Sequence, residues 1–512
     1  MSAAVLLFVA LAAVVVSRVV LAVLRFRRVE LAFDGEPSLP VLGNSLAFLG
    51  ATEDDVFYRI RGLWGGRRHV TRMSLLGHLI LIVSDPDDIE KVFRGKDTQD
   101  KSRIFYQFLE YISRNGLVTI NGAEWRTHRK ALTPAFHGEL LDKYQEVFDE
   151  EAKGFLARVR PGVAHDVMPS LKTGSARAFF RTALTTDITG DAADFFPVMM
   201  EVLEAFPRTM TFRSFQPWFW TDATFGLTSL GRHVTDLIAK VDLYYAKKMA
   251  RKEMARVRSQ LHRKGHEEDF IKERPTLIEI LLQDSDSPLP DRHIMDEPDR
   301  HIMDELIIFT GAAIETTVAS LGWTFKTLSL RPDVQDRILE EVDEVVGQAG
   351  AVLPEHLPRL EYTERVIKES LRLTPAVPML ARGNLHAATT FNGKHVPKGS
   401  TFLVNMLGAH RDPRHWEEPL KFDPDRWLPE RSQGRHHYAY MPFSAGPRNC
   451  IGGRYAMAVM KTLLANVLPR YRVDPVDDGL TDPATFPMSF GIASQLPGGV
   501  HVVFTPRQPS AA

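Results

Sequence analysis

The sequence predicts a mainly helical protein with a smaller β portion, preceded by an N-terminal transmembrane helix. The first observation is an apolar run at residues 3–24, since a helix needs about 20 apolar residues to cross a bilayer. The second is a helical period and composition in four long segments, residues 124–160, 232–262, 302–330 and 455–470. The third is residues 70–83, which look like two paired strands.

The apolar run is best interpreted as a membrane anchor. Arg18 is its one charged residue and lies near the end, where a long side chain can reach the headgroups. A basic group follows at once, at Arg25, Arg27 and Arg28. By the positive-inside rule, the chain after the helix faces the cytoplasm.

Two other targeting segments fit this N-terminus less well. A cleaved signal peptide would carry its charges before a shorter apolar core, and a mitochondrial presequence would be amphipathic. We therefore predict an anchor at residues 1–28 and one globular domain at residues 29–512. Pro37 and Pro40 favour an extended, stiff path between the two.

Composition narrows the possible functions. The chain has 512 residues and a net charge of -1, so its overall charge gives no sign of a nucleic-acid partner. Cys450 is the single cysteine, which excludes an intramolecular disulfide and a zinc site built on several thiolates. No G-x-G-x-x-G nucleotide motif is evident.

A short repeat precedes the third helical segment. The string DRHIMDE occurs at residues 291–297 and again at 299–305, with Pro298 between the copies. We expect the second copy to enter the helix and the first to lie in a surface loop around residues 283–300. The repeat carries no functional interpretation.

The single cysteine lies in an unusual loop, residues 443–452, which read FSAGPRNCIG. A helix begins just beyond it, and the positive end of a helix dipole favours the thiolate that binds metals. Gly446 allows a sharp turn, and Gly452 allows a bulky flat ligand to approach the backbone. Phe443 can cover the sulfur, and Arg448 supplies a cation suited to a carboxylate.

This loop resembles the cysteine-ligand loop of the cytochrome P450 superfamily, F-x-x-G-x-R-x-C-x-G, at every fixed position. The resemblance implies a mainly α fold with a small β-rich portion. It also implies haem b (iron protoporphyrin IX), with Cys450 as axial ligand of the iron and Phe443, Arg448 and Gly452 around it. A thiolate ligand pushes electron density onto the iron and favours cleavage of the O–O bond.

Further motifs match the same family. Trp125 and Arg129 share a helical face and resemble the pair that holds a haem propionate, and Arg382 matches a second propionate arginine. Glu369, Arg372 and Arg426 resemble a buried cluster whose role is structural.

A carboxylate and hydroxyls interrupt the apolar segment 302–330. Such groups are costly in an apolar helix unless they are paired or useful. Glu315 and Thr316 match the family's acid–threonine pair, which implies proton delivery to iron-bound dioxygen. A helix bent by threonine hydroxyls bonded back to carbonyls is the plainer interpretation, and both can hold.

The resemblance extends from the proline segment almost to residue 505. The strings WRTHRKALTPAFH and PFSAGPRNCIG are similar to those of the clan that contains the fatty-acid omega-hydroxylases. Many members esterify haem through a glutamate, but Ala312 stands at the matching position, so we expect non-covalent haem. Position relative to the family implies a substrate pocket that includes Ala312, Thr316, Val377, Met379 and Phe490.

The implied function is an oxidoreductase of the monooxygenase type (EC 1.14). It would insert one oxygen atom into an apolar small molecule such as a fatty acid, a hormone or a xenobiotic. NADPH-cytochrome P450 reductase would supply electrons, with cytochrome b5 as a further donor, at the cytoplasmic face of the endoplasmic reticulum membrane. Peroxide-rearranging relatives often lack the acid–threonine pair, which argues against that activity, and the intact pair also argues against a haem sensor.

Two surfaces have open interpretations. Residues 205–226 are rich in aromatics and either pack in the core, which we favour, or dip into the membrane at the substrate entrance. A basic face would attract an acidic reductase or would simply be solvated, and it comprises Arg126, His128, Lys130, Arg454 and Lys461.

Overall fold

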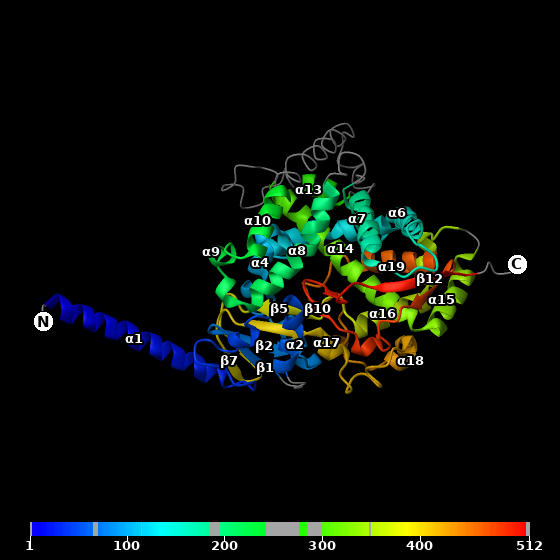
Figure 1. Cartoon of the computed structure of the whole chain (residues 1–512). Coiled ribbons are helices and arrows are strands. Elements are labelled where there is room, and N and C mark those ends of the chain that lie inside the picture. The colour runs from blue at the N-terminus through cyan, green and yellow to red at the C-terminus, as the bar shows by residue number, and fades with distance from the viewer. Residues whose placement is uncertain are drawn as a thin grey trace.

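The computed structural model describes residues 3–64, 70–113, 115–184, 195–241, 276–283, 300–347 and 350–507. Helices dominate this part of the chain, as the sequence predicts (Figure 1). The helices are α1 (Ala3–Glu30), α2 (Glu53–Trp64), α3 (Pro86–Arg94), α4 (Arg103–Ser113), α5 (Gly122–Leu132), α6 (Gly138–Leu156), α7 (Met168–Ala183), α8 (Phe195–Phe215), α9 (Asp222–Phe225), α10 (Ser229–Val241), α13 (Leu277–Gln283), α14 (Arg300–Ser329), α15 (Pro332–Val345), α16 (Glu361–Leu373), α17 (Met406–His410), α18 (Pro429–Ser432) and α19 (Gly453–Val467).

The smaller β portion consists of short strands in separate sheets. The largest sheet has the order β1-β2-β8-β5-β3, in which β2 and β8 run parallel and the other neighbours run antiparallel. Its β1–β2 hairpin confirms the strand pair expected at residues 70–83. The strands are β1 (Thr71–Leu75), β2 (His78–Val83), β3 (Asp100–Lys101), β4 (His165–Asp166), β5 (Met379–Gly383), β6 (Thr389–Phe391), β7 (Lys394–Val396), β8 (Thr401–Asn405), β9 (Tyr471–Pro475), β10 (Ser489–Phe490), β11 (Ser494–Gln495) and β12 (His501–Pro506).

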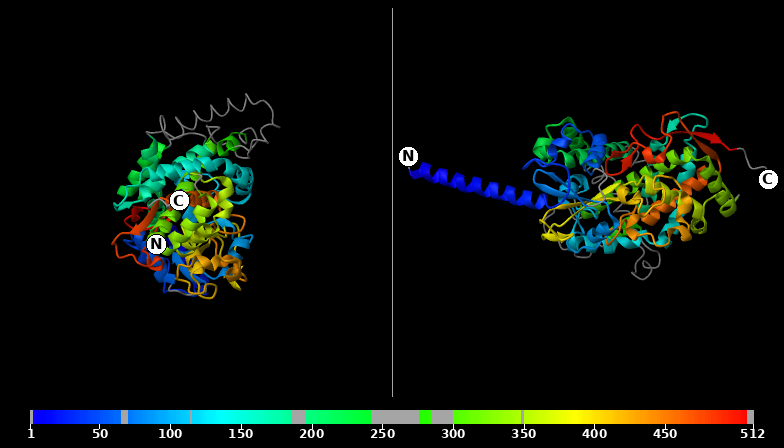
Figure 2. Two further views of the ribbon diagram at one scale, coloured as in Figure 1. Left: turned by 90° about the vertical axis from the view of Figure 1, so that its right-hand side faces the viewer. Right: turned by 90° about the horizontal axis from the view of Figure 1, so that it is seen from below.

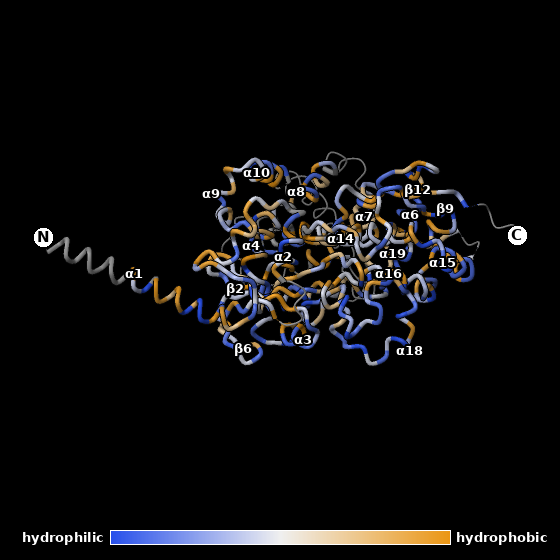
Figure 3. The backbone as a smooth tube through the Cα atoms, turned by 60° about the horizontal axis from the view of Figure 1, so that its bottom comes forward, coloured by the Kyte–Doolittle hydropathy of each residue, from blue (hydrophilic) through white to orange (hydrophobic). Residues whose placement is uncertain are grey.

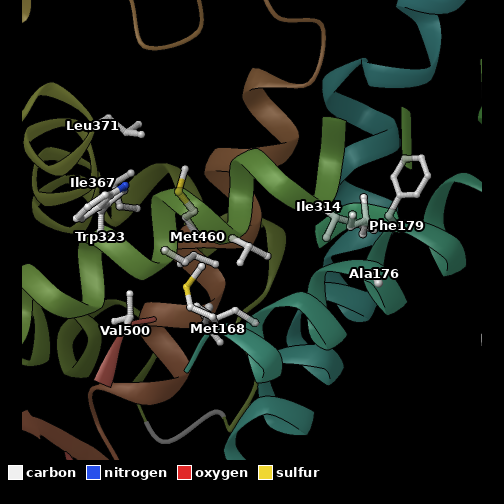
Figure 4. Close-up of a cluster of buried hydrophobic side chains, with 14 of the residues drawn as sticks. Met168, Ala176, Phe179, Ile314, Trp323, Ile367, Leu371, Met460 and Val500 are labelled. Carbon is white, nitrogen blue, oxygen red and sulfur yellow. The ribbon is translucent and has the colours of Figure 1, made fainter. Parts of the chain in front are cut away.

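Helix α14 is the centre of the main core. Figure 4 shows its residues Ile314 and Trp323 among side chains from α7, α16 and α19. Trp323 is only 1% exposed, and its indole nitrogen donates to the hydroxyl of Ser494 at 3.1 Å. Burial of one large apolar side chain stabilises a fold by about 1.5–3 kcal/mol, so this packing fixes α14 firmly beside the functional site.

Helix α1 projects from the globular body in Figure 1 and in the right-hand view of Figure 2. Its 28 residues span about 42 Å at the usual helical rise. Its base is anchored by Glu30, which is fully buried and accepts hydrogen bonds from the hydroxyls of Ser38 and Ser74, each at 2.6 Å. Arg72 of β1 reaches the same carboxylate at 3.2 Å. These contacts join the last turn of α1 to the sheet.

The sequence prediction was wrong about one long helix. Residues 124–160 form two helices, α5 and α6, separated by a 3-10 turn at Thr133–Phe136. Pro134 cannot supply an amide hydrogen to an α-helical ladder, which explains the break. The predicted helix at 232–262 is described only as far as Val241, the end of α10.

The third predicted helix is confirmed as α14, and the fourth as α19. The second DRHIMDE copy enters α14 from Arg300, as expected. The first copy and most of the predicted loop lie outside the described residues. Among the described residues, one helical segment, Asp304–Ser329, is long and apolar enough to cross a membrane. However, 72% of that window is buried inside the protein, as suits a core helix.

The aromatic stretch at 205–226 packs mainly inward, which is the interpretation that we favoured. Phe206 and Phe215 are buried, and Arg213 lies over the rings of Phe108 and Phe225. Trp218 to Trp220 are half-buried at the edge of this cluster.

Candidate active site

A cavity of about 340 Å³ lies between α14, α5 and the loop that carries Cys450. The loop is shaped by Gly446, whose φ is +71° and where an added Cβ would lie 3.0 Å from the carbonyl oxygen of Phe93. The amide of Cys450 donates to the carbonyl of Phe443 at 2.8 Å, which closes the turn just before α19 begins at Gly453. The Cys450 side chain is exposed to the cavity, although it lies deep within the molecule.

Opposing effects act on the Cys450 thiol. Burial raises its pKa above the ordinary value, because the charged thiolate loses contact with water. A backbone hydrogen bond from Gly452 and the charges of Arg129 and Lys101 act in the opposite direction. The surroundings of the sulfur therefore favour a ligand that compensates the thiolate charge, as a metal cation does.

Four cationic side chains line this cavity, and none of its lining residues is acidic. They are Lys101, Arg129, Arg382 and Arg448. Burial, followed by the charges of Arg382 and Arg448, lowers the pKa of Lys101 well below its ordinary value. Such crowding of like charges is costly without a counter-ion, so the site suits an anionic ligand.

Several donors on these arginines lack partners. The Nε and Nη1 atoms of Arg448 and the Nε atom of Arg382 are buried and make no hydrogen bond. Buried donors without acceptors are rare and costly, and carboxylates satisfy arginines in a bidentate geometry. The two propionates of haem would supply such carboxylates, so the residues present fit the expected cofactor.

The predicted pair Trp125 and Arg129 lies on one face of α5, beside the cavity. The guanidinium of Arg448 lies over the Trp125 ring at 4.5 Å from its centre. Arg129 donates to the backbone carbonyl and the side-chain oxygen of Asn449, each at 2.8 Å. The structure thus ties α5 directly to the residue before Cys450.

The acid–threonine pair of α14 is divided between two environments. Thr316 lines the cavity, and its hydroxyl donates to the carbonyl of Ala312 at 2.8 Å. Glu315 is 3% exposed and turns away, accepting from Gln495 at 3.1 Å with Lys172 at 3.7 Å. Burial raises the pKa of Glu315, and Lys172 opposes the shift.

The predicted cluster of Glu369, Arg372 and Arg426 is fully assembled. Arg372 donates twice to Glu369 at 2.9 Å, and the Nε of Arg426 donates to Glu369 at 2.9 Å. Glu369 also accepts from the indole of Trp427 at 3.1 Å. All three members of the predicted cluster are nearly inaccessible, so the cluster joins α16 to the segment leading to the cysteine loop.

Comparisons with known proteins agree with this geometry. A family model described as Cytochrome P450 matches residues 34–498. The chain belongs to the cytochrome P450 family. Cytochrome P450 4V2 of Rattus norvegicus is 30% identical over 456 residues, covering 85% of this chain and 83% of its own. In Drosophila melanogaster, cytochrome P450 4c3 is 28% identical over 461 residues (86% and 84%), and cytochrome P450 4d2 is 29% identical over 486 residues (92% and 93%).

These relatives belong to P450 family 4, which confirms the resemblance to the omega-hydroxylase clan. The chain is accordingly a P450 monooxygenase, an oxidoreductase whose family implies haem. Among the described residues, no group of three or more His, Cys, Asp or Glu side chains could hold a metal ion.

The structure places most of the expected pocket residues of this P450 together. Ala312, Val377 and Met379 line the cavity. Phe490 belongs to β10, but its side chain lies outside the described residues, and the neighbouring Gly491 and Ile492 line the cavity.

Sequence reasoning missed several residues. Lys101 reaches the cavity because β3 pairs with β5, which sets Lys101 opposite Arg382. Tyr106 lies beside it, with its hydroxyl 3.1 Å from the Lys101 nitrogen. Lys172 and Gln495, the partners of Glu315, also come from distant segments. No sequence motif marks any of these four residues.

The predicted basic face was only partly right. Arg126, Lys130 and Arg454 are exposed. His128 instead lies 2.7 Å from the buried carboxylate of Glu305, and Lys461 is 5% exposed and contacts Glu364 at 2.5 Å. Both side chains have carboxylate partners inside the fold, so a reductase would meet a smaller basic patch than the sequence predicted.

Proposed function

We propose that this P450 hydroxylates an apolar small molecule of the fatty-acid, hormone or xenobiotic type. The observation that carries the proposal is the position of Cys450 in an apolar cavity whose wall also holds buried arginine donors without partners. Haem held through a thiolate would supply the chemistry that activates dioxygen for transfer of one oxygen atom to a substrate.

Some residues of this chain would hold haem b, and others would deliver protons. Cys450 would bind the iron, while Trp125, Arg129, Arg382 and Arg448 would hold the propionates. The cofactor would stay non-covalent, since Ala312 has no carboxyl group to form an ester. Its small side chain faces the cavity and leaves room beside the haem.

Thr316 and Glu315 are suited to proton delivery. The Thr316 hydroxyl lies at the cavity wall, where it can hold a proton donor near the reacting atoms. The raised pKa of Glu315 favours its protonated form, so this carboxyl can resupply the proton after a side-chain rotation. Lys172 and Gln495 hold Glu315 in its resting position.

The cavity lining supports an apolar substrate. Much of the cavity wall consists of aromatic and aliphatic side chains, which exclude water and favour an apolar ligand. These side chains include Phe105, Leu109, Phe179, Phe215, Ile308 and Phe309.

Electrons would come from NADPH-cytochrome P450 reductase, with cytochrome b5 as a second donor. The exposed cations Arg126, Lys130 and Arg454 lie on α5 and α19, close to the Cys450 loop. Positive charge there would speed encounter with an acidic partner.

The anchor 1–28 would hold the catalytic domain 29–512 at the cytoplasmic face of the endoplasmic reticulum membrane. Helix α1 is longer than the roughly 30 Å apolar thickness of a bilayer. Val16, Val20, Leu21 and Leu24 are exposed on it, as suits contact with lipid.

The test is turnover by the full chain with reductase, NADPH and isotopically labelled dioxygen. The proposal expects one labelled oxygen atom in the product of a bound apolar compound. Product formed from a peroxide without reductase or dioxygen would instead assign a rearranging enzyme. Haem binding with no turnover of any ligand in a broad apolar panel would assign a sensor.

A further inference from the structure

A second cavity, of about 310 Å³, lies between residues 414–417 and residues 426–435. It shares no lining residue with the haem cavity. Figure 3 shows that the loops around α18 are hydrophilic, and Figure 1 shows α18 well away from α1. The lining residues are Arg414, His415, Glu417, Arg426, Arg431, Gln433, Gly434 and Arg435.

The charges of this cavity do not balance. Four of its lining residues are arginines and one is a histidine, whereas Glu417 is the only carboxylate. Glu417 lies 4.0 Å from Arg431 and is itself 83% exposed, so solvent weakens its effect.

Three of the arginines have carboxylate partners outside the lining. Arg414 pairs with Asp412 at 2.5 Å and with Asp85 at 2.7 Å. Arg431 pairs with Asp423 at 2.9 Å, and Arg426 is committed to Glu369 in the structural cluster. These pairs fix the positions of the three guanidinium groups.

Arg435 is different, because no carboxylate in the described residues pairs with it. Its Nη2 donates to the carbonyls of Arg426 at 3.1 Å and Arg431 at 3.0 Å. Its guanidinium lies over the rings of Trp416 at 4.1 Å and Trp427 at 5.3 Å. Burial and the charge of Arg426 lower its pKa. This cation is held rigidly, while its Nε and Nη1 donors make no hydrogen bond to the described residues.

We propose that this cavity binds a phosphate group, carried by a small dissolved molecule, with Arg435 and Arg431 as its principal ligands. A rigid guanidinium with free donors matches phosphate oxygens in a two-bond geometry. The tetrahedral dianion would relieve the repulsion among the clustered arginines. His415 adds a donor at the same wall, and the cavity is large enough for an organic residue attached to the phosphate.

The experiment uses the full-length holoprotein and two measurements, isothermal titration with sodium phosphate and the melting temperature in phosphate against chloride at equal ionic strength. Glycerol 3-phosphate in a parallel titration distinguishes a phosphate monoester on a small dissolved molecule from the free ion. The variants are Arg435→Gln, Arg431→Gln and Glu417→Gln. The matched control is Arg472→Gln, which removes an exposed arginine of β9 outside this cavity.

The proposal expects saturable binding, a higher melting temperature in phosphate than in chloride, and at least tenfold weaker binding in Arg435→Gln and Arg431→Gln. Glu417→Gln should bind phosphate at least as tightly as the unmodified protein, and Arg472→Gln should match the unmodified protein. Equal melting temperatures in both salts, or unchanged binding in the two arginine variants, would overturn the proposal. If Arg435→Gln fails to fold, phosphate binding by the Arg431→Gln variant tests the proposal, since Arg431 is more exposed.

Discussion

Arg448 illustrates how single residues prepare this site for an anionic cofactor. It stacks on Trp125 and bonds the carbonyl of Ile120, yet two of its buried nitrogens have no partner. The local motif around Cys450 was enough to assign Arg448 to a carboxylate. The same reasoning could not find Lys101, because its place opposite Arg382 depends on a strand pair that joins segments far apart in sequence.

Arg448→Gln should weaken haem binding roughly tenfold to a hundredfold, because a hydrogen bond to a charged group is worth about 1.5–3 kcal/mol. The rate of haem transfer to an excess of an apo-globin measures this change. Arg454→Gln removes an exposed cation four residues beyond Cys450 and should retain haem normally. Equal haem loss in the two variants would contradict the propionate role.

Glu315→Gln should change how stability depends on pH. Burial raises the pKa of Glu315, so the folded protein holds this proton more tightly than the unfolded chain does. The stability contributed by the group therefore falls as pH rises above the ordinary value of 4.5.

The glutamine variant cannot ionise at this position. Its free energy of unfolding should therefore increase, relative to that of the unmodified protein, as pH rises. Urea unfolding at several pH values measures the difference, with the exposed Glu340→Gln as a matched substitution. A constant difference across pH would show that Glu315 does not resist ionisation in the fold.

At the scale of elements, local sequence predicted α14, α19 and the β1–β2 hairpin, because no proline interrupts any of these segments. It failed at Pro134, where one predicted helix is two. It also misjudged His128 and Lys461, whose partners Glu305 and Glu364 are remote in sequence. Their exposure depended on tertiary contacts that composition does not encode.

Glu369→Ala should cost about 3–5 kcal/mol of unfolding free energy, because it leaves two buried arginines without their shared carboxylate. Denaturant unfolding of the holoprotein measures this loss. Arg472→Ala breaks an exposed pair with Asp474 and should cost at most about 1 kcal/mol. Comparable losses in the two variants would mean that the cluster does not join α16 to the cysteine-loop segment as described.

At the scale of the whole molecule, a helical body with a small β portion contains the cavity. Helix α1 projects from this body, and Glu30 in its last turn is buried where the two meet. The sequence predicted the helix from its apolar run. The sequence did not reveal the contacts that hold Glu30, because their partners Ser74 and Arg72 come from the sheet. The joint between α1 and the body is therefore more constrained than a proline linker alone would make it.

Deletion of residues 1–24 should release the protein from membranes, since it removes the apolar run but keeps Arg27 and Glu30 at the joint. Fractionation of cell membranes after a high-salt wash provides the measurement, and haem content reports that the body remains folded. A folded truncated protein that stays in the washed membranes would place the attachment elsewhere.

The central claim is that Cys450 binds a haem iron as thiolate, and the carbon monoxide difference spectrum of the reduced protein tests it most directly. The account predicts a red-shifted Soret band typical of thiolate ligation, and its loss in Cys450→Ala. A full haem load without that band, or the same band in the variant, would contradict the assignment of Cys450 as the ligand.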